Sequence, residues 1–287
     1  MFEGFKTSGI AANNVIINTL IKGHGPALLL LHGYPQTHVM WHKIAPMLAD
    51  HFTLVATDLR GYGDSSKPDG DAQHECYSKR AMAADQVAVM AALGFEKFML
   101  AAHDRGARVA HRLLLDHPER VTRAALLDII PTPEVFKRID QFTATAYYHW
   151  FFLIQRRDLP ERLIGADPEY YLRRMGTRAG KDVFAPEAFA EYLRCFRDPA
   201  CIHATCEDYR AAASVDLKHH KDDGGRMITC PLLLLWGKEG LLERAYDPVA
   251  VWRQYAADVR GHSLPAGHFL SEEAPRETLD ALVEFFS

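Results

Sequence analysis

Short hydrophobic stretches alternate with longer amphipathic stretches along most of the chain. The hydrophobic stretches predict strands over residues 27–31, 52–57, 97–101, 124–129, 231–236 and 259–264. The amphipathic stretches predict helices over residues 38–49, 81–93, 106–117 and 275–286. Buried strands that alternate with helices are typical of a mostly parallel sheet with helices on both faces. The pattern therefore predicts an α/β fold with a twisted, mostly parallel sheet.

The interval 133–215 departs from this alternation. It contains no convincing strand, but it has helical patterns rich in aromatic and charged residues. Prolines interrupt these patterns at positions 160, 168, 186 and 199. We therefore predict an α/β core domain formed by residues 1–132 and 216–287, and a helical cap formed by residues 133–215. The cap would lie over the carboxyl edge of the sheet, where ligands bind in such folds.

The composition argues against several classes of protein. Of the 287 residues, 48% are hydrophobic and the net charge is −4, so the chain can bury a sizeable core. Lysine and arginine are scattered, so no nucleic-acid-binding face is expected. No stretch approaches the roughly 20 apolar residues of a membrane helix, and residues 1–18 lack the pattern of a signal peptide. We expect a cytoplasmic protein that binds neither nucleic acid nor membrane.

Nothing in the sequence points to a metal or an organic cofactor. The 5 cysteines have no repeated spacing. Cys201, His203 and Cys206 are close in sequence, but they lie in a predicted helix where that spacing does not bring ligands together. Reduced cysteines of a cytoplasmic protein are the preferred interpretation.

The segment from Phe98 to Arg108 predicts a strand, a sharp turn and a helix. Its centre, Ala102-His-Asp-Arg-Gly106, matches the nucleophile elbow pattern Gly-x-Ser-x-Gly, with an aspartate in the nucleophile position. A carboxylate is ionised at neutral pH and can displace a leaving group from saturated carbon, which forms an ester. Asp104 could instead cap the following helix. The elbow pattern favours the nucleophile.

His268 follows the last predicted strand, where the base of an elbow-containing fold is expected. It would activate the water that hydrolyses the ester. Two acids could orient His268. Asp128 ends a predicted strand, whereas Glu239 follows the next strand in a loop flanked by glycines. We favour Asp128 because it lies directly at the carboxyl edge of the sheet, although it could also be a turn residue before Pro131.

Backbone and side-chain groups near the elbow suggest how charge is stabilised. The backbone N–H groups of Tyr34 and Arg105 predict an oxyanion hole. Arg105 and Arg108 lie one turn apart at a helix start, where each cation opposes the helix dipole by about 0.3–1 kcal/mol. Either an anionic substrate or ion pairs with cap carboxylates would compensate. We favour a substrate carboxylate bound by both guanidinium groups.

Several motifs make a family resemblance specific. They are His32-Gly-Tyr-Pro-Gln-Thr-His38, His103-Asp-Arg-Gly-Ala-Arg108, Tyr148-His-Trp150, Cys206-Glu-Asp-Tyr-Arg210 and Gly267-His268. Over essentially its whole length, the chain resembles the fluoroacetate dehalogenases, within the dehalogenase and epoxide hydrolase branch of the α/β-hydrolase superfamily. One departure is Tyr34, where that branch frequently has a phenylalanine.

The resemblance implies roles for individual residues. It implies a catalytic triad of Asp104, Asp128 and His268, and a substrate carboxylate held by Arg105 and Arg108. It also implies that the halide leaves toward hydrogen-bond donors of the cap, and these are His149, Trp150 and Tyr209. Imidazole, indole and phenol groups can all donate, although aromatic residues of a cap also commonly serve packing. The implied protein is a homodimer that hydrolyses fluoroacetate or chloroacetate without a cofactor.

Two other functions compete with this one. An epoxide hydrolase would use the same aspartate ester and would protonate the epoxide oxygen with cap tyrosines, for which Tyr147, Tyr148 and Tyr209 are candidates. Arg105 argues against it, because that branch generally has a bulky aromatic residue after the nucleophile. A binding protein that keeps the fold without turnover is the third possibility. The complete set of Asp104, Asp128 and His268 argues against that function.

Overall fold

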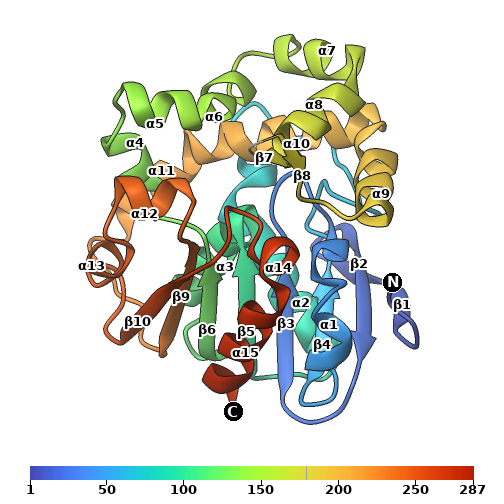
Figure 1. The fold of residues 1–287 in the computed structure, drawn as a ribbon, viewed down its shortest axis with the longest axis vertical. Coiled ribbons are helices and arrows are strands. Elements are labelled where there is room, and N and C mark those ends of the chain that lie inside the picture. The colour runs from blue at the N-terminus through green and yellow to red at the C-terminus, as the bar shows by residue number, and fades with distance from the viewer. Residues whose placement is uncertain (179) are drawn as a thin grey trace.

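The computed structural model describes residues 1–178 and 180–287, and it has the predicted α/β architecture (Figure 1). Its main sheet has 8 strands in the order β1-β2-β4-β3-β5-β6-β9-β10. β2 runs antiparallel to both of its neighbours, and the strands from β4 to β10 in this order are parallel. The strands are β1 (Lys6–Ala12), β2 (Val15–Lys22), β3 (Ala27–Leu31), β4 (Thr53–Thr57), β5 (Phe98–His103), β6 (Val121–Leu127), β9 (Leu232–Gly237) and β10 (Val259–Leu264).

The sheet is covered by helices on both faces. Leu29 and Leu31 of β3 belong to the same hydrophobic cluster as residues of α2 (Lys79–Ala92) and α3 (Asp104–Asp116). Leu28 and Leu30 belong to a second cluster with residues of α1 (Ala45–Leu48) and α15 (Pro275–Phe286). Successive side chains of a strand point to opposite faces. Strands buried on both faces therefore need hydrophobic residues at every position, which explains the continuous apolar runs in the sequence.

The secondary-structure predictions are confirmed except at a few places. The predicted strands and the helices predicted over 81–93, 106–117 and 275–286 are present within a few residues of the expected bounds. The β1–β2 hairpin was not predicted, because β1 is partly exposed and has no continuous apolar run. The single helix predicted over 38–49 is wrong. A 3-10 helix, His38–Trp41, is followed by the short α1, which begins at Ala45. Pro46 lies in the first turn of α1, and its missing N–H prevents a continuous helix from running through this position.

Helices form a cap above the carboxyl edge of the sheet (Figure 1). They are α4 (Thr132–Lys137), α5 (Gln141–Ala146), α6 (Tyr148–Leu153), α7 (Leu159–Ala166), α8 (Pro168–Gly176), α9 (Pro186–Phe196) and α10 (Pro199–Ala212). The prolines seen in the sequence lie in the first turns of α7 to α10, where a missing N–H costs nothing. The expectation of no strand is wrong in one place, because β7 (Thr177–Arg178) pairs with β8 (Lys181–Asp182).

The remaining elements connect the cap to the last strands and complete the core. They are a 3-10 helix at Glu75–Tyr77, α11 (Val215–Asp222), α12 (Leu241–Ala245), α13 (Pro248–Trp252) and α14 (Leu270–Glu273). α14 follows the loop that carries His268. Among the residues described, no helix combines the length and the apolar character required to span a membrane.

Candidate active site

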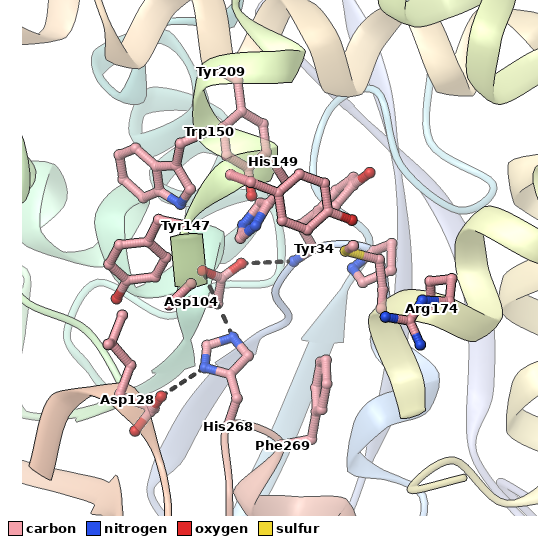
Figure 2. Close-up of a pocket in the computed structure, with 15 residues that line it drawn as sticks. Tyr34, Asp104, Asp128, Tyr147, His149, Trp150, Arg174, Tyr209, His268 and Phe269 are labelled. Carbon is pink, nitrogen blue, oxygen red and sulfur yellow. Dashed lines mark hydrogen bonds and ion pairs between the residues drawn. The ribbon is translucent and has the colours of Figure 1, made fainter. Parts of the chain in front are cut away.

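Asp104 lies at the turn between β5 and α3, and its side chain faces a cavity of about 250 Å³ (Figure 2). Its φ of +43° is in the left-handed region, which is costly for a residue with a side chain. Gly106 allows this turn, because a Cβ there would lie 2.3 Å from the carbonyl oxygen of His32. The Gly106 N–H donates to that same oxygen at 2.9 Å. The strained turn therefore lifts the Asp104 carboxylate above the sheet.

The contacts of Asp104 keep its carboxylate ionised. The backbone N–H of Tyr34 donates to Oδ1 at 2.9 Å, and Oδ2 lies 3.9 Å from Nε2 of His268. Burial raises the pKa of Asp104, but the charges of His268, His103, Arg105 and Arg108 outweigh it and hold the pKa at about 2. Asp104 is the first residue of α3 and not its N-cap, which is His103. Asp104 thus has the geometry of a nucleophile, with one oxygen held and the other facing His268.

His268 and Asp128 are joined by a short hydrogen bond at the carboxyl edge of the sheet (Figure 2). Nδ1 of His268 donates to Oδ2 of Asp128 at 2.6 Å, and the N–H of Gly237 donates to Oδ1 of Asp128 at 2.9 Å. Burial lowers the pKa of His268, but the hydrogen bond and charge of Asp128, together with Asp104, raise it overall. Glu239 is exposed and does not line the cavity. Of the two acids considered, the structure brings Asp128 to His268.

His103, which sequence reasoning did not single out, supports the loop that carries His268. Its Nε2 lies 2.8 Å from the carbonyl oxygen of His268, so this nitrogen must carry the proton and donate. Complete burial lowers the pKa of His103 to about 3, so the ring is neutral at physiological pH. In the sequence, only the position of His103 next to Asp104 could have indicated this role.

Aromatic residues of the cap form the wall of the cavity opposite His268. His149 and Trp150 come from α6 and Tyr209 comes from α10, and all three line the cavity (Figure 2). The ring of Tyr209 lies 5.9 Å from that of His149 and 5.6 Å from that of Trp150, in edge-to-face contacts. Burial lowers the pKa of His149 to about 4, so it is a neutral donor. The Tyr209 hydroxyl is buried and makes no hydrogen bond within the described chain. These residues therefore provide both packing and polar groups.

Arg105 forms an ion pair with the cap. Its Nε donates to Oδ2 of Asp208 at 3.0 Å, and its Nη2 donates to Oδ1 at 2.7 Å. The guanidinium carbon also lies 4.1 Å from the centre of the Tyr209 ring. The alternative considered from the sequence, an ion pair with a cap carboxylate, is therefore present at Arg105. Nη1 is the one guanidinium nitrogen of Arg105 that has no hydrogen-bond partner among the described residues. It is therefore the only nitrogen of this side chain that remains to bind a substrate.

Substitution of Arg105 by methionine is expected to destabilise the fold. Both side chains of the pair are 0% exposed, and breaking a buried pair typically costs about 3–5 kcal/mol. Asp208 would retain its contacts with Lys79 and with the Tyr62 hydroxyl. We therefore expect the free energy of unfolding to fall by about 3 kcal/mol, the lower end of this range. Urea unfolding measures it. Arg173→Met, which breaks an exposed pair with Glu169, should cost less than about 1 kcal/mol. An equal effect of both substitutions would contradict this assignment.

Arg108 is buried next to Asp104 but has no acidic partner. Its Nη1 donates to the carbonyl oxygen of Ile130 at 2.9 Å and to Oγ1 of Thr132 at 3.0 Å. No carboxylate of a described residue forms a salt bridge with it, and its Nε has no hydrogen-bond partner in the same part of the chain. Burial and the charge of Arg105 lower the pKa of Arg108, and the charge of Asp104 acts in the opposite direction. Neither arginine lines the cavity itself.

The rest of the cavity wall was only partly foreseen. Tyr147 and Tyr148, considered as acids for epoxide opening, both line the cavity, and Tyr148 is 48% exposed. Sequence reasoning missed the contributions of Arg174, Met175 and Leu241. These residues belong to no motif, and only the packing of the cap on the core brings them to the site. Among the described residues, no group of three or more histidine, cysteine or acidic side chains is arranged to hold a metal ion.

The fold and the elbow define a class, and the comparisons agree with it. Residues 26–275 match the family model described as alpha/beta hydrolase fold. The chain therefore belongs to the α/β-hydrolase family, and it is a hydrolase. It is 48% identical to fluoroacetate dehalogenase from Burkholderia sp, over 100% of this chain and 95% of that protein. This similarity confirms the resemblance inferred from the sequence motifs.

Other relatives cover the chain equally well. The soluble epoxide hydrolase of Corynebacterium sp. (strain C12) is 33% identical over 96% of this chain and 95% of that protein. The crystal structure of ALR0039 from Nostoc sp PCC 7120 has a TM-score of 0.97 and 59% identity, and it covers 100% of this chain and 99% of that one. The comparisons thus include one relative named as a dehalogenase and one named as an epoxide hydrolase.

Proposed function

We propose that this hydrolase cleaves the carbon–halogen bond of haloacetates, fluoroacetate or chloroacetate, and releases glycolate and halide. The observation that carries the proposal is the buried guanidinium of Arg108, which lies beside the ionised Asp104 and has no carboxylate partner among the described residues. A buried cation is costly unless an anion compensates it. Asp104 offsets part of this cost, the carboxylate of a small acid would offset more of it, and a neutral substrate would not.

In the first step, Oδ2 of Asp104 attacks the α-carbon of the haloacetate. A carbon–oxygen bond forms, the carbon–halogen bond breaks, and the electron pair of that bond leaves with the halide. Arg108 and Nη1 of Arg105 bind the substrate carboxylate and offset its repulsion from Asp104. This requires a shift of the side chains, because neither arginine lines the cavity. The halide leaves toward His149, Trp150 and Tyr209, whose N–H and O–H groups replace part of its hydration shell. The support for this direction is that all three side chains line the cavity.

In the second step, water attacks the carbonyl carbon of the ester on Asp104. Nε2 of His268 accepts a proton from this water, while Asp128 stabilises the imidazolium that forms. Oδ1 becomes the oxyanion, and the N–H of Tyr34, which already donates to it at 2.9 Å, and the N–H of Arg105 stabilise its charge. Collapse of this intermediate breaks the bond between the carbonyl carbon and the glycolate oxygen, which takes up the second proton of the added water. The Asp104 carboxylate is restored and glycolate is released. The proton passes from His268 to solvent.

The two steps are expected to respond differently to pH. The pKa of His268 is raised above its usual value, so the neutral base is lost as the pH falls through that pKa. Asp104 stays ionised down to a pH of about 2, so ester formation continues in the range where hydrolysis fails. Turnover should therefore decline in mild acid while the ester on Asp104 accumulates. Rapid-quench mass spectrometry at several pH values measures the ester fraction. An ester fraction that stays constant while turnover declines would contradict this assignment of the base.

Epoxide hydrolysis is the second candidate function. Tyr147 and Tyr209 line the cavity and have the phenol groups that could protonate an epoxide oxygen. The similarity to a soluble epoxide hydrolase supports this candidate as well. Against it stand Arg105 and Arg108, because two buried cations beside the nucleophile give no advantage to a neutral epoxide.

One experiment separates the candidates. The purified protein is supplied with fluoroacetate, with chloroacetate and with styrene oxide, and free halide, glycolate and diol are measured. Halide and glycolate in equal amounts, with little or no diol, are expected. Diol formation without halide release would support the epoxide hydrolase instead. Asp104→Asn is the control, because the amide is a poor nucleophile and should abolish either reaction.

A further inference from the structure

Arg174 lines the cavity but has no role in the proposed chemical steps. It belongs to α8, its side chain is exposed, and it lines the cavity together with its neighbour Met175. Figure 2 shows Arg174 on the side of the cavity opposite Asp128. Tyr148, which is 48% exposed, also lines the cavity, and the charge of Arg174 lowers the pKa of its phenol against the larger opposing effect of burial. Arg174 and Tyr148 therefore mark where the cavity opens to solvent.

The charge of Arg174 is unpaired within the part of the chain that the structure describes. None of the acidic side chains in the described chain forms a salt bridge with it. The adjacent Arg173 is different, because it pairs with Glu169 at 3.0 Å and with Asp182 at 3.6 Å. Arg173 also lies over the ring of Phe189 and does not line the cavity. Two consecutive arginines thus have different environments, and one presents an uncompensated positive charge at the mouth of the cavity.

We infer that Arg174 is a specificity-determining residue that concentrates small carboxylates at the mouth of the cavity, and this inference rests on the proposed function. A positive charge at the opening of a cleft raises the local concentration of anions, and salt screens this effect over about 8–10 Å. The charge acts on the haloacetate and on the glycolate product alike, since both are monoanions. It takes no part in bond breaking, so it affects binding and leaves the chemical step unchanged.

The test compares Arg174→Gln and Arg174→Glu with wild type, and Arg173→Gln is the matched control. At low ionic strength the KM for chloroacetate should rise about threefold in Arg174→Gln and about tenfold in Arg174→Glu. The kcat should stay within about twofold of wild type, and the difference in KM should disappear near 0.5 M salt, because the screening length is then only about 4 Å. The KM for the neutral chloroacetamide should not change.

Other results would overturn the inference. They are an unchanged KM for chloroacetate, the same effect in Arg173→Gln, an equal effect on chloroacetamide, or a difference that persists in high salt. Calorimetric titration with glycolate gives a readout that does not need turnover. If wild type releases no halide, the proposed function fails. A weaker glycolate affinity in Arg174→Gln alone would then still support the role at the mouth, whereas equal affinities or no binding would exclude it.

Discussion

Replacement of His268 by alanine is expected to stop turnover after the first step and to leave an ester on Asp104. The nucleophile does not need the base, because the pKa of Asp104 near 2 keeps it ionised at neutral pH. Hydrolysis does need it, since Nε2 of His268 lies 3.9 Å from Oδ2 of Asp104 and would accept the proton of the attacking water. Loss of a general base typically slows a reaction by about 10²–10⁴-fold. One equivalent of halide per site should therefore be released in a burst, followed by almost no turnover.

Mass spectrometry after incubation with chloroacetate measures this outcome. The peptide that contains Asp104 should gain the mass of one carboxymethyl group in His268→Ala and remain unmodified in the double variant Asp104→Asn, His268→Ala. The double variant separates alkylation of Asp104 from reaction of chloroacetate with cysteines. An unmodified Asp104 in a variant that still releases a burst of halide would rule out the covalent scheme.

Replacement of Arg108 by glutamine is expected to lower kcat/KM for chloroacetate by about 10- to 100-fold. A charge-assisted hydrogen bond contributes about 1.5–3 kcal/mol, and a tenfold change in rate corresponds to about 1.4 kcal/mol. The same substitution should affect chloroacetamide far less, since its amide carries no negative charge. Arg108 is the sharper choice than Arg105, whose guanidinium is already paired with Asp208. The ratio of kcat/KM for the two substrates is the quantity to compare.

The control for this substitution addresses the structural contacts of Arg108. Its Nη1 donates to Oγ1 of Thr132 and to the carbonyl oxygen of Ile130. Thr132→Val removes one of these contacts and leaves the charge in place. It should alter stability slightly and should not change the preference for chloroacetate over chloroacetamide. A similar loss of preference in both variants would show that Arg108 acts through the position of α4 and not through its charge.

The sequence was sufficient to predict the fold because its signals are local. Strands buried on both faces, such as β3, must be hydrophobic at every position, and this pattern is visible without any tertiary information. The β1–β2 hairpin was not predicted because the exposed residues of β1 interrupt the hydrophobic pattern. The break near Pro46 was misjudged because the hydrophobic periodicity continues across it. Where a single proline interrupts a helical hydrophobic pattern, the pattern alone predicts a helix that is too long.

The same distinction applies to the site. Asp104, Asp128 and His268 each follow a strand, and the carboxyl ends of parallel strands meet at one edge, so their proximity could be predicted. The partner of Arg105 could not. Asp208 is separated from it by 103 residues and comes from a cap helix whose packing on the core has no sequence signature. Ion pairs between distant segments depend on the angle at which helices cross, and the sequence does not contain this angle in readable form.

The buried pair between Arg105 and Asp208 restricts how the molecule can move. Lys79 of α2 and the Tyr62 hydroxyl also bind Asp208, so α10 is joined to two core helices and a loop by charged contacts without solvent. A hinge motion that lifted α10 away from the core would leave these charged groups buried without partners, at a cost of several kcal/mol for each. Cap and core should therefore behave as one rigid body. Passage of small molecules then depends on rotamer changes at the mouth of the cavity. Exposed side chains change rotamer in picoseconds to nanoseconds.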